Sequence, residues 1–204
     1  MGAKVTALEP DHALASYLRK SLADTEVEVI EDTFESARLR HHHFDLVVAA
    51  MSFHWVDQQI GLPKIRQVLR PGGCVALWWT LFGDPSRPDP FQDATRDLLG
   101  APMPPEPRGL PFEIDLDGWR HALSRGAGLV EFDAEVIRWT ARLDTRQVRA
   151  FYASTIAVRR RPSRERERLL NELVTRADSH FRGIAERPFV TAVYTAHRAD
   201  SDWN

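Results

Sequence analysis

The chain has a single cysteine, Cys74, among 204 residues, so no intrachain disulfide can form and a reducing compartment is expected. It has no apolar run long enough to cross a membrane, and Met1-Gly2-Ala3-Lys4 contains no apolar signal core. Basic and acidic residues nearly balance, with a formal net charge of -2, so the domain-wide charge that would favour nucleic acid or an anionic membrane is missing. These absences predict a cytoplasmic protein whose partner is a small molecule.

What the chain does have is enough apolar material for a core. Its hydrophobic content is 43%, and we detect no internal repeat or low-complexity tract. The simplest organisation is one domain over residues 1–204.

The stretch Phe44–Trp55 is the most informative part of the chain. Phe44–Ala50 is a short apolar run that predicts a strand buried on both faces of a parallel sheet. Met51–Trp55 then lies just beyond the carboxyl end of that strand, where open α/β sheets bind their ligands. An alternative stays open: Phe53, His54 and Trp55 could simply close the end of a hydrophobic core.

A second candidate site follows the first predicted strand, Lys4–Leu8. Glu9-Pro10-Asp11 forms an acidic turn before residues with helical spacing, from Ala13 to Leu22. A carboxylate there can accept hydrogen bonds from two vicinal hydroxyls, as on a ribose. Glu9 is the candidate, although a solvated turn acid would give the same pattern.

Alternation predicts a further strand over Glu26–Ile30, followed by a polar connection that contains His41-His42-His43. Three consecutive residues on regular backbone cannot all point at one ion, and no nearby Cys or His spacing completes a site. We therefore expect no metal.

Apolar spacing that includes Ile60 and Ile65 predicts a helix over Asp57–Arg70, which Pro71-Gly72-Gly73 stops. Cys74–Thr80 is expected to be another buried strand with Trp78 and Trp79 at its carboxyl end. An apolar setting raises the pKa of a thiol, so Cys74 is expected to be unreactive.

Residues 83–111 contain eight of the thirteen prolines and one predicted helix, Phe91–Leu99. A proline-rich excursion from the carboxyl end of a strand predicts a lid over a pocket, and a plain surface loop is the alternative. A helix capped by Asp117 follows and ends at Gly126 or Gly128. We assign residues 83–128 to this lid or substrate insertion.

The remaining residues, 129–204, are predicted to close the sheet. The expected elements are a strand over Val130–Leu143, a helix over Thr145–Val158, a long amphipathic helix with Leu169 and Leu173 in its buried stripe, and a β-rich segment over Pro188–His197. Six arginines between residues 159 and 168 favour the solvated start of the long helix over an anion-binding surface.

Four motifs, in order, resemble the class I S-adenosylmethionine-dependent methyltransferases that act on small molecules. They are Val5-Thr6-Ala7-Leu8-Glu9-Pro10-Asp11, Asp32-Thr33-Phe34-Glu35, Phe44-Asp45-Leu46-Val47-Val48 with Phe53-His54-Trp55-Val56-Asp57, and Val68-Leu69-Arg70-Pro71-Gly72-Gly73. The resemblance implies a Rossmann-like α/β fold, with a mostly parallel sheet and helices on both faces. Residues 1–82 would then be a partial donor-binding core.

The resemblance also implies roles for individual residues. Glu9 would bind the ribose hydroxyls of S-adenosylmethionine, and Asp32, Thr33 and Phe34 would surround its adenine. Ala50 and Met51 would line its amino-acid side. His54 and Trp55 would face the transferred methyl or the acceptor. Independently of the resemblance, His54 could also serve as general base, and Trp79 at the end of its predicted strand is a further candidate for contact with the small-molecule acceptor.

One departure from the family pattern accompanies this match. Members of the family open with a strand, a glycine-rich turn and a helix, and this sequence is expected to start after them. The lost strand would lie between the Lys4–Leu8 and Phe44–Ala50 strands, leaving two edges roughly 10 Å apart, about two strand spacings. We expect impaired donor binding and a tendency to pair with a second copy of the chain, as in a homodimer.

Two other functions remain open at this point. A catalytically inactive methyltransferase-like subunit could bind a ligand or partner through the same surface. A nicotinamide-dependent dehydrogenase would also suit an acidic residue such as Glu9, although the Phe44–Trp55 and Pro71-Gly72-Gly73 patterns argue against it.

Overall fold

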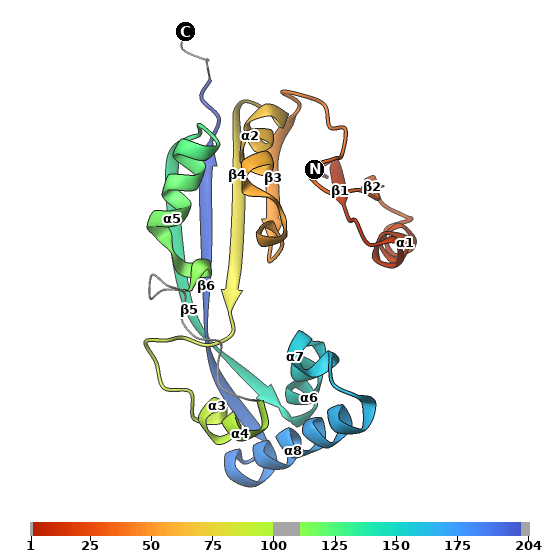
Figure 1. The fold of residues 1–204 in the computed structure, drawn as a ribbon, viewed down its shortest axis with the longest axis vertical. Helices are drawn as coiled ribbons and strands as arrows, with labels where there is room; N and C mark the ends of the chain where they lie inside the picture. Colours follow the sequence, from red (N-terminus) through yellow and green to blue (C-terminus); the bar gives the residue numbers. More distant parts are fainter. Residues whose placement is uncertain (1, 100–110, 201–204) are drawn as a thin grey trace. The chain divides into compact units, whose positions relative to one another are not determined.

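A computed structural model describes residues 2–99 and 111–200 (Figure 1). The chain divides into two compact units, which we call unit 1 and unit 2 and describe separately. Unit 1 comprises Met1–Trp78, Leu116–Ala134 and Val193–Asn204, and unit 2 comprises Trp79–Asp115 and Glu135–Ala192. Residues 100–110 of the predicted lid lie outside the described part of the chain.

Unit 1 begins with the predicted strand, acidic turn, helix and second strand. Strand β1 (Val5–Leu8) pairs in parallel with β2 (Val27–Ile30), and α1 (His12–Ser21) connects them. Asp11 caps α1, because its side chain accepts a hydrogen bond of 2.9 Å from the backbone N–H of Leu14. These elements confirm the sequence-based prediction to within one residue at most boundaries.

The next parallel pair is β3 (Phe44–Ala50) and β4 (Leu69–Leu81), joined through η1 (Phe53–Trp55) and α2 (Gln58–Val68). β3 has the predicted bounds. The predicted end of the helix at Pro71 is wrong, because α2 ends at Val68 and the chain enters β4 directly.

The Pro71-Gly72-Gly73 segment therefore lies within β4. Gly72 adopts a left-handed φ of 69°, and Gly72 and Gly73 exchange backbone hydrogen bonds of 3.0 and 2.8 Å with Arg198. A Cβ atom on Gly73 would lie 3.0 Å from the carbonyl oxygen of Phe44, so a side chain there would crowd the neighbouring strand. The glycines permit close strand approach here.

The strand order β3-β4-β6-β5 puts β3 at an edge of the four-stranded sheet, while β1 and β2 form a separate two-stranded sheet. The α/β, Rossmann-like class is confirmed, and so is the adjacency of β3 and β4. The expectation that β3 is central and buried on both faces is wrong. Among the described residues, β1 and β3 each have a strand neighbour on one side only.

One face of the β3–β4 pair is well covered and the other is not. Val75 and Leu77 on one face of β4 are fully buried. Leu46 and Val48, on the opposite face of β3, are 53% and 55% exposed. They pair with Cys74 and Ala76, which are half-buried. Because directly paired residues share a face, these four side chains form one partly open apolar surface, which we call the β3–β4 open face.

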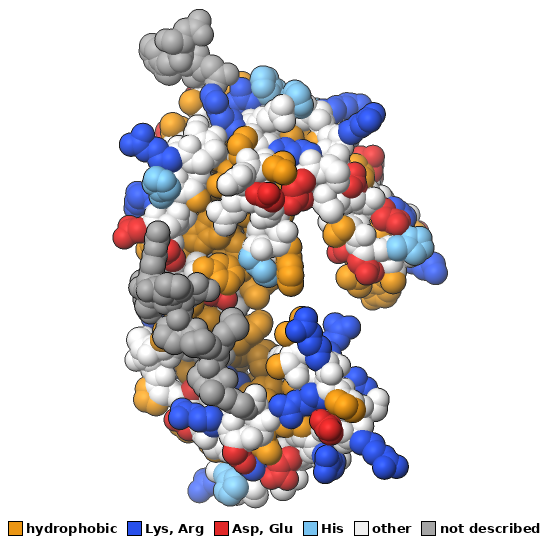
Figure 2. Space-filling model, viewed as in Figure 1, with side chains coloured by type: hydrophobic (Ala, Val, Ile, Leu, Met, Phe, Trp, Pro, Cys, Tyr) orange, Lys and Arg blue, Asp and Glu red, His pale blue; other side chains and the backbone are white. Residues whose placement is uncertain are grey.

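Helices of unit 1 cover the other face. α2 contributes buried Leu62, Ile65 and Val68, and α5 (Leu116–His121) continues into a π-helical turn over Ala122–Gly126. Figure 2 shows hydrophobic side chains gathered between α5 and the turn after β3. Two details differ from expectation: α5 starts at Leu116, so Asp117 is not its cap, and Ile60 is half exposed.

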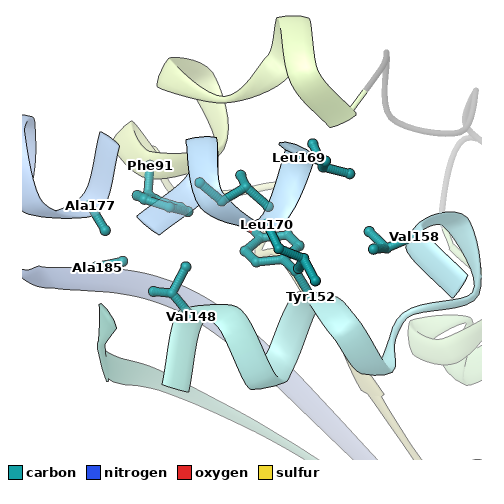
Figure 3. Close-up of a cluster of buried hydrophobic side chains, with 9 residues drawn as sticks. Phe91, Val148, Tyr152, Val158, Leu169, Leu170, Ala177 and Ala185 are labelled. Atoms are coloured by element: carbon teal, nitrogen blue, oxygen red, sulfur yellow. The ribbon is translucent and has the colours of Figure 1, made fainter. Parts of the chain in front are cut away.

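Unit 2 has a helical core of its own. α6 (Thr145–Ser154) packs on α8 (Ser163–Phe181), with α3 (Pro90–Ala94), α4 (Arg96–Leu99) and α7 (Ile156–Arg159) nearby. Strands β5 (Val130–Asp144) and β6 (Ile184–His197) contribute residues to both units. The buried cluster in Figure 3 joins the helices, and its members are Phe91, Val148, Tyr152, Val158, Leu169, Leu170, Leu173, Ala177 and Ala185.

Two helices that the sequence predicts as continuous are broken at threonines. Thr95 separates α3 from α4, and its hydroxyl donates to the carbonyl oxygen of Phe91 at 2.7 Å. Thr155 separates α6 from α7 in an extended conformation, with ψ of 143°. The hydroxyl of Thr155 likewise donates to the carbonyl oxygen of Tyr152 at 2.8 Å. A threonine hydroxyl that bonds to a carbonyl oxygen three or four residues earlier competes with helical hydrogen bonding, which accounts for both interruptions.

A buried arginine links several elements of unit 2. Arg187 on β6 is 3% exposed, and its Nε donates to Oδ2 of Asp89 at 2.6 Å. It also donates to the hydroxyl of Tyr152 and to Oε1 of Gln92, the latter at 3.1 Å. Burial raises the pKa of Tyr152 to about 12. The hydrogen-bonded partners compensate the cost of burying the guanidinium.

The arginine run from residue 159 lies mostly at the surface. Figure 2 shows basic side chains gathered over α7, and Arg159 and Arg160 are exposed. The predicted solvated start of the long helix is consistent with this exposure. No helix among residues 2–99 and 111–200 is both long and apolar enough to cross a membrane.

Candidate cofactor-binding site

Glu9 lies directly beyond β1, next to the end of β2. Its backbone N–H donates to the carbonyl oxygen of Ile30 at 3.1 Å, which extends the strand pairing by one residue. Its carboxylate Oε1 accepts a hydrogen bond of 2.9 Å from the N–H of Asp11. A carboxylate offers about four lone-pair sites, so this bond leaves capacity for a ligand's hydroxyls.

The loop after β2 is held by its own side chains. Oδ1 of Asp32 accepts hydrogen bonds from the N–H of Thr33, at 2.8 Å, and from the hydroxyl of Ser36. The hydroxyls of Thr33 and Ser36 lie 2.7 Å apart. Asp32 and Thr33 therefore order the loop that the family resemblance assigns to adenine.

Phe34 brings this loop into contact with the turn after β3. Its ring centroid lies 6.5 Å from that of Phe53, and the ammonium of Lys64 on α2 lies 5.5 Å from the Phe34 ring centroid. Phe34 is half-buried, so part of its ring remains accessible. Two segments that the sequence predicted as parts of one site thus meet in the structure.

Glu35 and Lys64 tie the same loop to α2. Oε1 of Glu35 accepts a hydrogen bond of 2.8 Å from the N–H of Asp57, which lowers the pKa of the Glu35 carboxyl. The ammonium of Lys64 donates to the carbonyl oxygens of Glu35 and Ala37 at 3.0 and 2.6 Å. Sequence reasoning did not assign either side chain a role, because nothing in the spacing pairs residues 29 positions apart.

Met51 occupies a strained position at the end of β3. Its φ is 52°, in the left-handed region that non-glycine residues seldom adopt, and its N–H donates to the carbonyl oxygen of Trp78 at 2.9 Å. Strained backbone of this kind concentrates at functional sites. Ala50, just before it, is exposed and pairs with Trp78.

The three aromatic residues of η1 differ in how exposed they are. Phe53 is buried and lies 6.3 Å, centroid to centroid, from Trp119 of α5. Trp55 is 77% exposed, and its ring lies 5.0 Å from that of the exposed His54. The interpretation that this turn closes a hydrophobic core therefore holds for Phe53 but is wrong for His54 and Trp55.

Trp79 lies in unit 2 and is fully buried. Its ring packs edge-on against Phe112 at a centroid distance of 5.9 Å. In this conformation Trp79 is part of a hydrophobic contact rather than of an accessible surface.

Cys74 and the histidine run show no reactive or metal-binding arrangement among the described residues. Burial raises the pKa of the Cys74 thiol, as predicted. His41–His43 are exposed, and within the described ranges no three His, Cys, Asp or Glu side chains cluster as metal ligands. The backbone N–H groups of His42 and His43 instead bond to Gln67 and Val68, both at 2.9 Å.

Residues 1–77, which contain most of these contacts, match a family model described as a methyltransferase domain. Over 78 residues the chain is 35% identical to uncharacterized methyltransferases of Mycobacterium bovis and of two strains of Mycobacterium tuberculosis. The match covers 38% of this chain and 31% of each of those proteins, so it concerns about a third of their length.

Solved structures share the fold over nearly the whole chain. A protein of Anaeromyxobacter dehalogenans described as a type II methyltransferase has a TM-score of 0.56 at 21% identity, covering 98% of this chain and 82% of that one. Phosphoethanolamine N-methyltransferase 2 of Haemonchus contortus, solved with S-adenosylhomocysteine, has a TM-score of 0.53 at 12% identity, covering 96% and 43%. The [4+2]-cyclase SpnF has a TM-score of 0.53 at 15% identity, covering 97% and 67%.

The cyclase is a reminder that one fold carries different chemistries. The sequence match is confined to residues 1–77, whereas the shared fold extends over nearly the whole chain. Residues 1–77 are therefore similar in sequence to a methyltransferase domain, and the chain as a whole shares the fold of solved S-adenosylmethionine-dependent methyltransferases.

Proposed function

We propose that this chain binds S-adenosylmethionine and takes part in methyl transfer to a small-molecule acceptor in the cytoplasm. The observation that carries the proposal is the contact between Phe34 and Phe53. It joins the loop after β2 to the turn after β3, within the residues that match the methyltransferase domain. Ligands of open α/β sheets bind beyond strand ends of this kind.

The side chains of this site suit the chemical groups of the cofactor. The carboxylate of Glu9 can accept hydrogen bonds from both ribose hydroxyls, and the accessible part of the Phe34 ring offers an apolar surface for adenine. The Asp32 and Thr33 turn supports that surface. Ala50 and the left-handed Met51 would line the amino-acid side of the donor.

S-adenosylmethionine, when bound, supplies an electrophilic methyl group on a sulfonium. The protein's part would be to align the acceptor nucleophile with that methyl. In the proposal, His54 accepts the proton that the nucleophile loses, and the exposed Trp55 ring contacts the acceptor. Trp79, the other residue expected to contact the acceptor, is fully buried and has no part in this proposal.

Donor affinity is expected to be weak for the chain as it stands. The proposed site has Glu9 for the ribose, Phe34 for the adenine and Met51 for one side of the amino-acid part of the cofactor. None of the described contacts supplies a row of backbone N–H groups for the carboxylate end of the cofactor. A charged group left without partners costs enough free energy to cancel several good contacts. The strand edges of β1 and β3, each paired on one side only, are consistent with an incomplete pocket wall.

Calorimetric titration with S-adenosylmethionine and with S-adenosylhomocysteine tests the proposal. We expect saturable binding that Glu9→Gln weakens about tenfold, because the amide lacks the negative charge and offers one acceptor oxygen in place of two. Glu28→Gln, on the neighbouring strand β2, is the matched control and should bind as the parent does. No heat from either ligand at millimolar concentration, or equal affinity in Glu9→Gln and Glu28→Gln, would contradict this site.

A second candidate function is a binding subunit without catalysis. It is favoured by the unpaired edge of β3 and by the β3–β4 open face, both of which suit pairing with a second copy of the chain. Binding of S-adenosylhomocysteine without methyl transfer to any acceptor in a screen would favour this candidate. Turnover of S-adenosylmethionine, measured as formation of S-adenosylhomocysteine, would favour the enzyme.

A further inference from the structure

Unit 2 contains a cavity of about 590 Å³ that no part of the proposed methyl transfer uses. It is framed by the loop before α3, the outer end of β5, the C-terminal end of α8 and the start of β6. Its size lies within the range of small-molecule sites. Every residue that lines it belongs to unit 2.

The lining carries an excess of positive charge. The cavity is lined by three arginines, Arg87, Arg142 and Arg182, and by one acidic residue, Glu186. The lining therefore has a surplus of two positive charges. Nε of Arg142 lies 3.1 Å from Oε1 of Glu186, so this pair is largely neutral. Arg87 donates to the hydroxyl of Thr140 at 3.3 Å. In residues 2–99 and 111–200, Arg182 has no ion-pair partner.

Arg182 also occupies an unusual backbone position. It ends α8 in the left-handed conformation, with φ of 53°, and Gly183 follows with φ of 79°. Glycine or asparagine usually fills such a position, because a Cβ atom is disfavoured there. The favourable field at a helix C-terminus is one reason for a cation. An arginine one turn earlier would interact with the helix dipole equally well and without the strained backbone. The helix dipole alone therefore does not explain why Arg182 lies on the cavity wall.

The rest of the wall is apolar and stiff. Pro88, Pro90 and Pro188 contribute rings with little conformational freedom, and Phe181 and Ile184 complete the surface. Such side chains lose little entropy when a ligand is bound. An apolar wall beside the guanidinium groups of Arg87 and Arg182 matches a ligand with an apolar body and an anionic head.

We propose that this cavity binds an organic anion: a carboxylate or phosphate monoester attached to an aromatic or aliphatic group. The anionic head lies between Arg87 and Arg182, where planar guanidinium groups can donate paired hydrogen bonds. The apolar body lies against the proline rings and Phe181. The site is independent of S-adenosylmethionine and of Glu9.

Phenyl phosphate and benzoate are the probes, with inorganic phosphate and benzyl alcohol representing the head and the body alone. We expect phenyl phosphate or benzoate to bind saturably with a dissociation constant below about 1 mM, a range ordinary for small ligands. Inorganic phosphate and benzyl alcohol should each bind at least about tenfold more weakly. The stronger of the two anionic probes identifies the preferred head group.

Two charge-removing variants locate the site. Arg182→Asn keeps a residue that tolerates the left-handed conformation, and Arg87→Gln keeps a polar side chain of similar length. Each should weaken binding of the preferred probe about tenfold, whereas Arg146→Asn on α6 should leave it unchanged. Thermal melts of all three variants verify folding, and added salt should weaken parent binding.

Equal affinity for phenyl phosphate, benzoate and benzyl alcohol would overturn the proposal. So would equal binding by Arg182→Asn, Arg87→Gln and Arg146→Asn. A loss of probe binding in Glu9→Gln would also overturn it, because it would move the probe to the cofactor site. The outcome is separate from that of the cofactor titration, which uses a different ligand and different variants.

Discussion

The backbone N–H of Asp57 donates a hydrogen bond of 2.8 Å to Oε1 of Glu35. A carboxylate from the loop after β2 is thereby held at the N-terminus of α2, where the helix dipole favours a negative charge. The ammonium of Lys64 holds the same loop from the side by bonding to its carbonyl oxygens. The three groups fix the loop that carries Phe34 against the helix that follows η1.

This arrangement predicts a dependence of stability on pH. The folded-state pKa of Glu35 is lowered, so its contribution is complete above the unfolded value of about 4.3 and is lost as pH falls through the folded value. We expect Glu35→Gln to lower the free energy of unfolding by about 1 kcal/mol at pH 7 and to flatten its dependence below pH 5. Urea titrations across this pH range measure both effects. Glu28→Gln should retain the parent's dependence.

Gly61 is predicted to be the least replaceable glycine near the candidate site. A Cβ atom there would lie 2.4 Å from Cγ1 of Val56 and 3.2 Å from Cζ of Phe53. Alanine normally stabilises a helix interior relative to glycine, but overpacking costs about 1 to 3 kcal/mol and should dominate. Gly61→Ala should therefore lower the melting temperature and weaken cofactor binding by displacing the turn with His54 and Trp55. Gly2→Ala, with no atom within 4 Å of its Cβ position, should change neither.

Removing the buried guanidinium group of Arg187 in unit 2 should be strongly destabilising. Arg187→Ala leaves the carboxylate of Asp89 and the hydroxyl of Tyr152 without their shared partner. The expected loss is about 3 to 5 kcal/mol. Adding Asp89→Asn to Arg187→Ala should recover part of it, because the uncompensated charge is gone. Arg149→Ala, which breaks an exposed pair with Glu167, should cost no more than about 1 kcal/mol in the same chemical denaturation assay.

The β3–β4 open face predicts self-association. We expect the sedimentation-derived mass to rise with protein concentration and Val48→Lys to abolish the rise, since a lysine on an edge strand opposes pairing. The substitution should cost little stability because Val48 is mostly exposed. Ile156→Lys on α7 replaces an equally exposed apolar residue and is the control. Association that persists in Val48→Lys would show that the open face is not the contact.

Local sequence signals predicted much of unit 1. The bounds of β3 follow from the largely apolar run Phe44–Ala50, and the start of α1 follows from the capping side chain of Asp11. The Glu9, Asp32–Phe34 and Met51–Trp55 segments were expected at strand ends, and the contact between Phe34 and Phe53 links the last two of them. Each of these inferences needed only residues a few positions apart.

What sequence reasoning missed depends on long-range pairing. An apolar run is the same whether a strand is central or at an edge, so the exposure of Leu46 and Val48 could not be foreseen. Pro71-Gly72-Gly73 stops a helix in most contexts, but here its close approach to Phe44 makes it part of β4. The contacts of Lys64 and the burial of Trp79 likewise depend on partners distant in the chain.

The open edge of β3 also bears on how long the protein survives after synthesis. A strand with one open edge beside exposed leucine and valine side chains is a template for aggregation and a target for cellular quality control. Pairing of this edge with a further strand should therefore lengthen the half-life of the chain, which a pulse-chase measurement would detect.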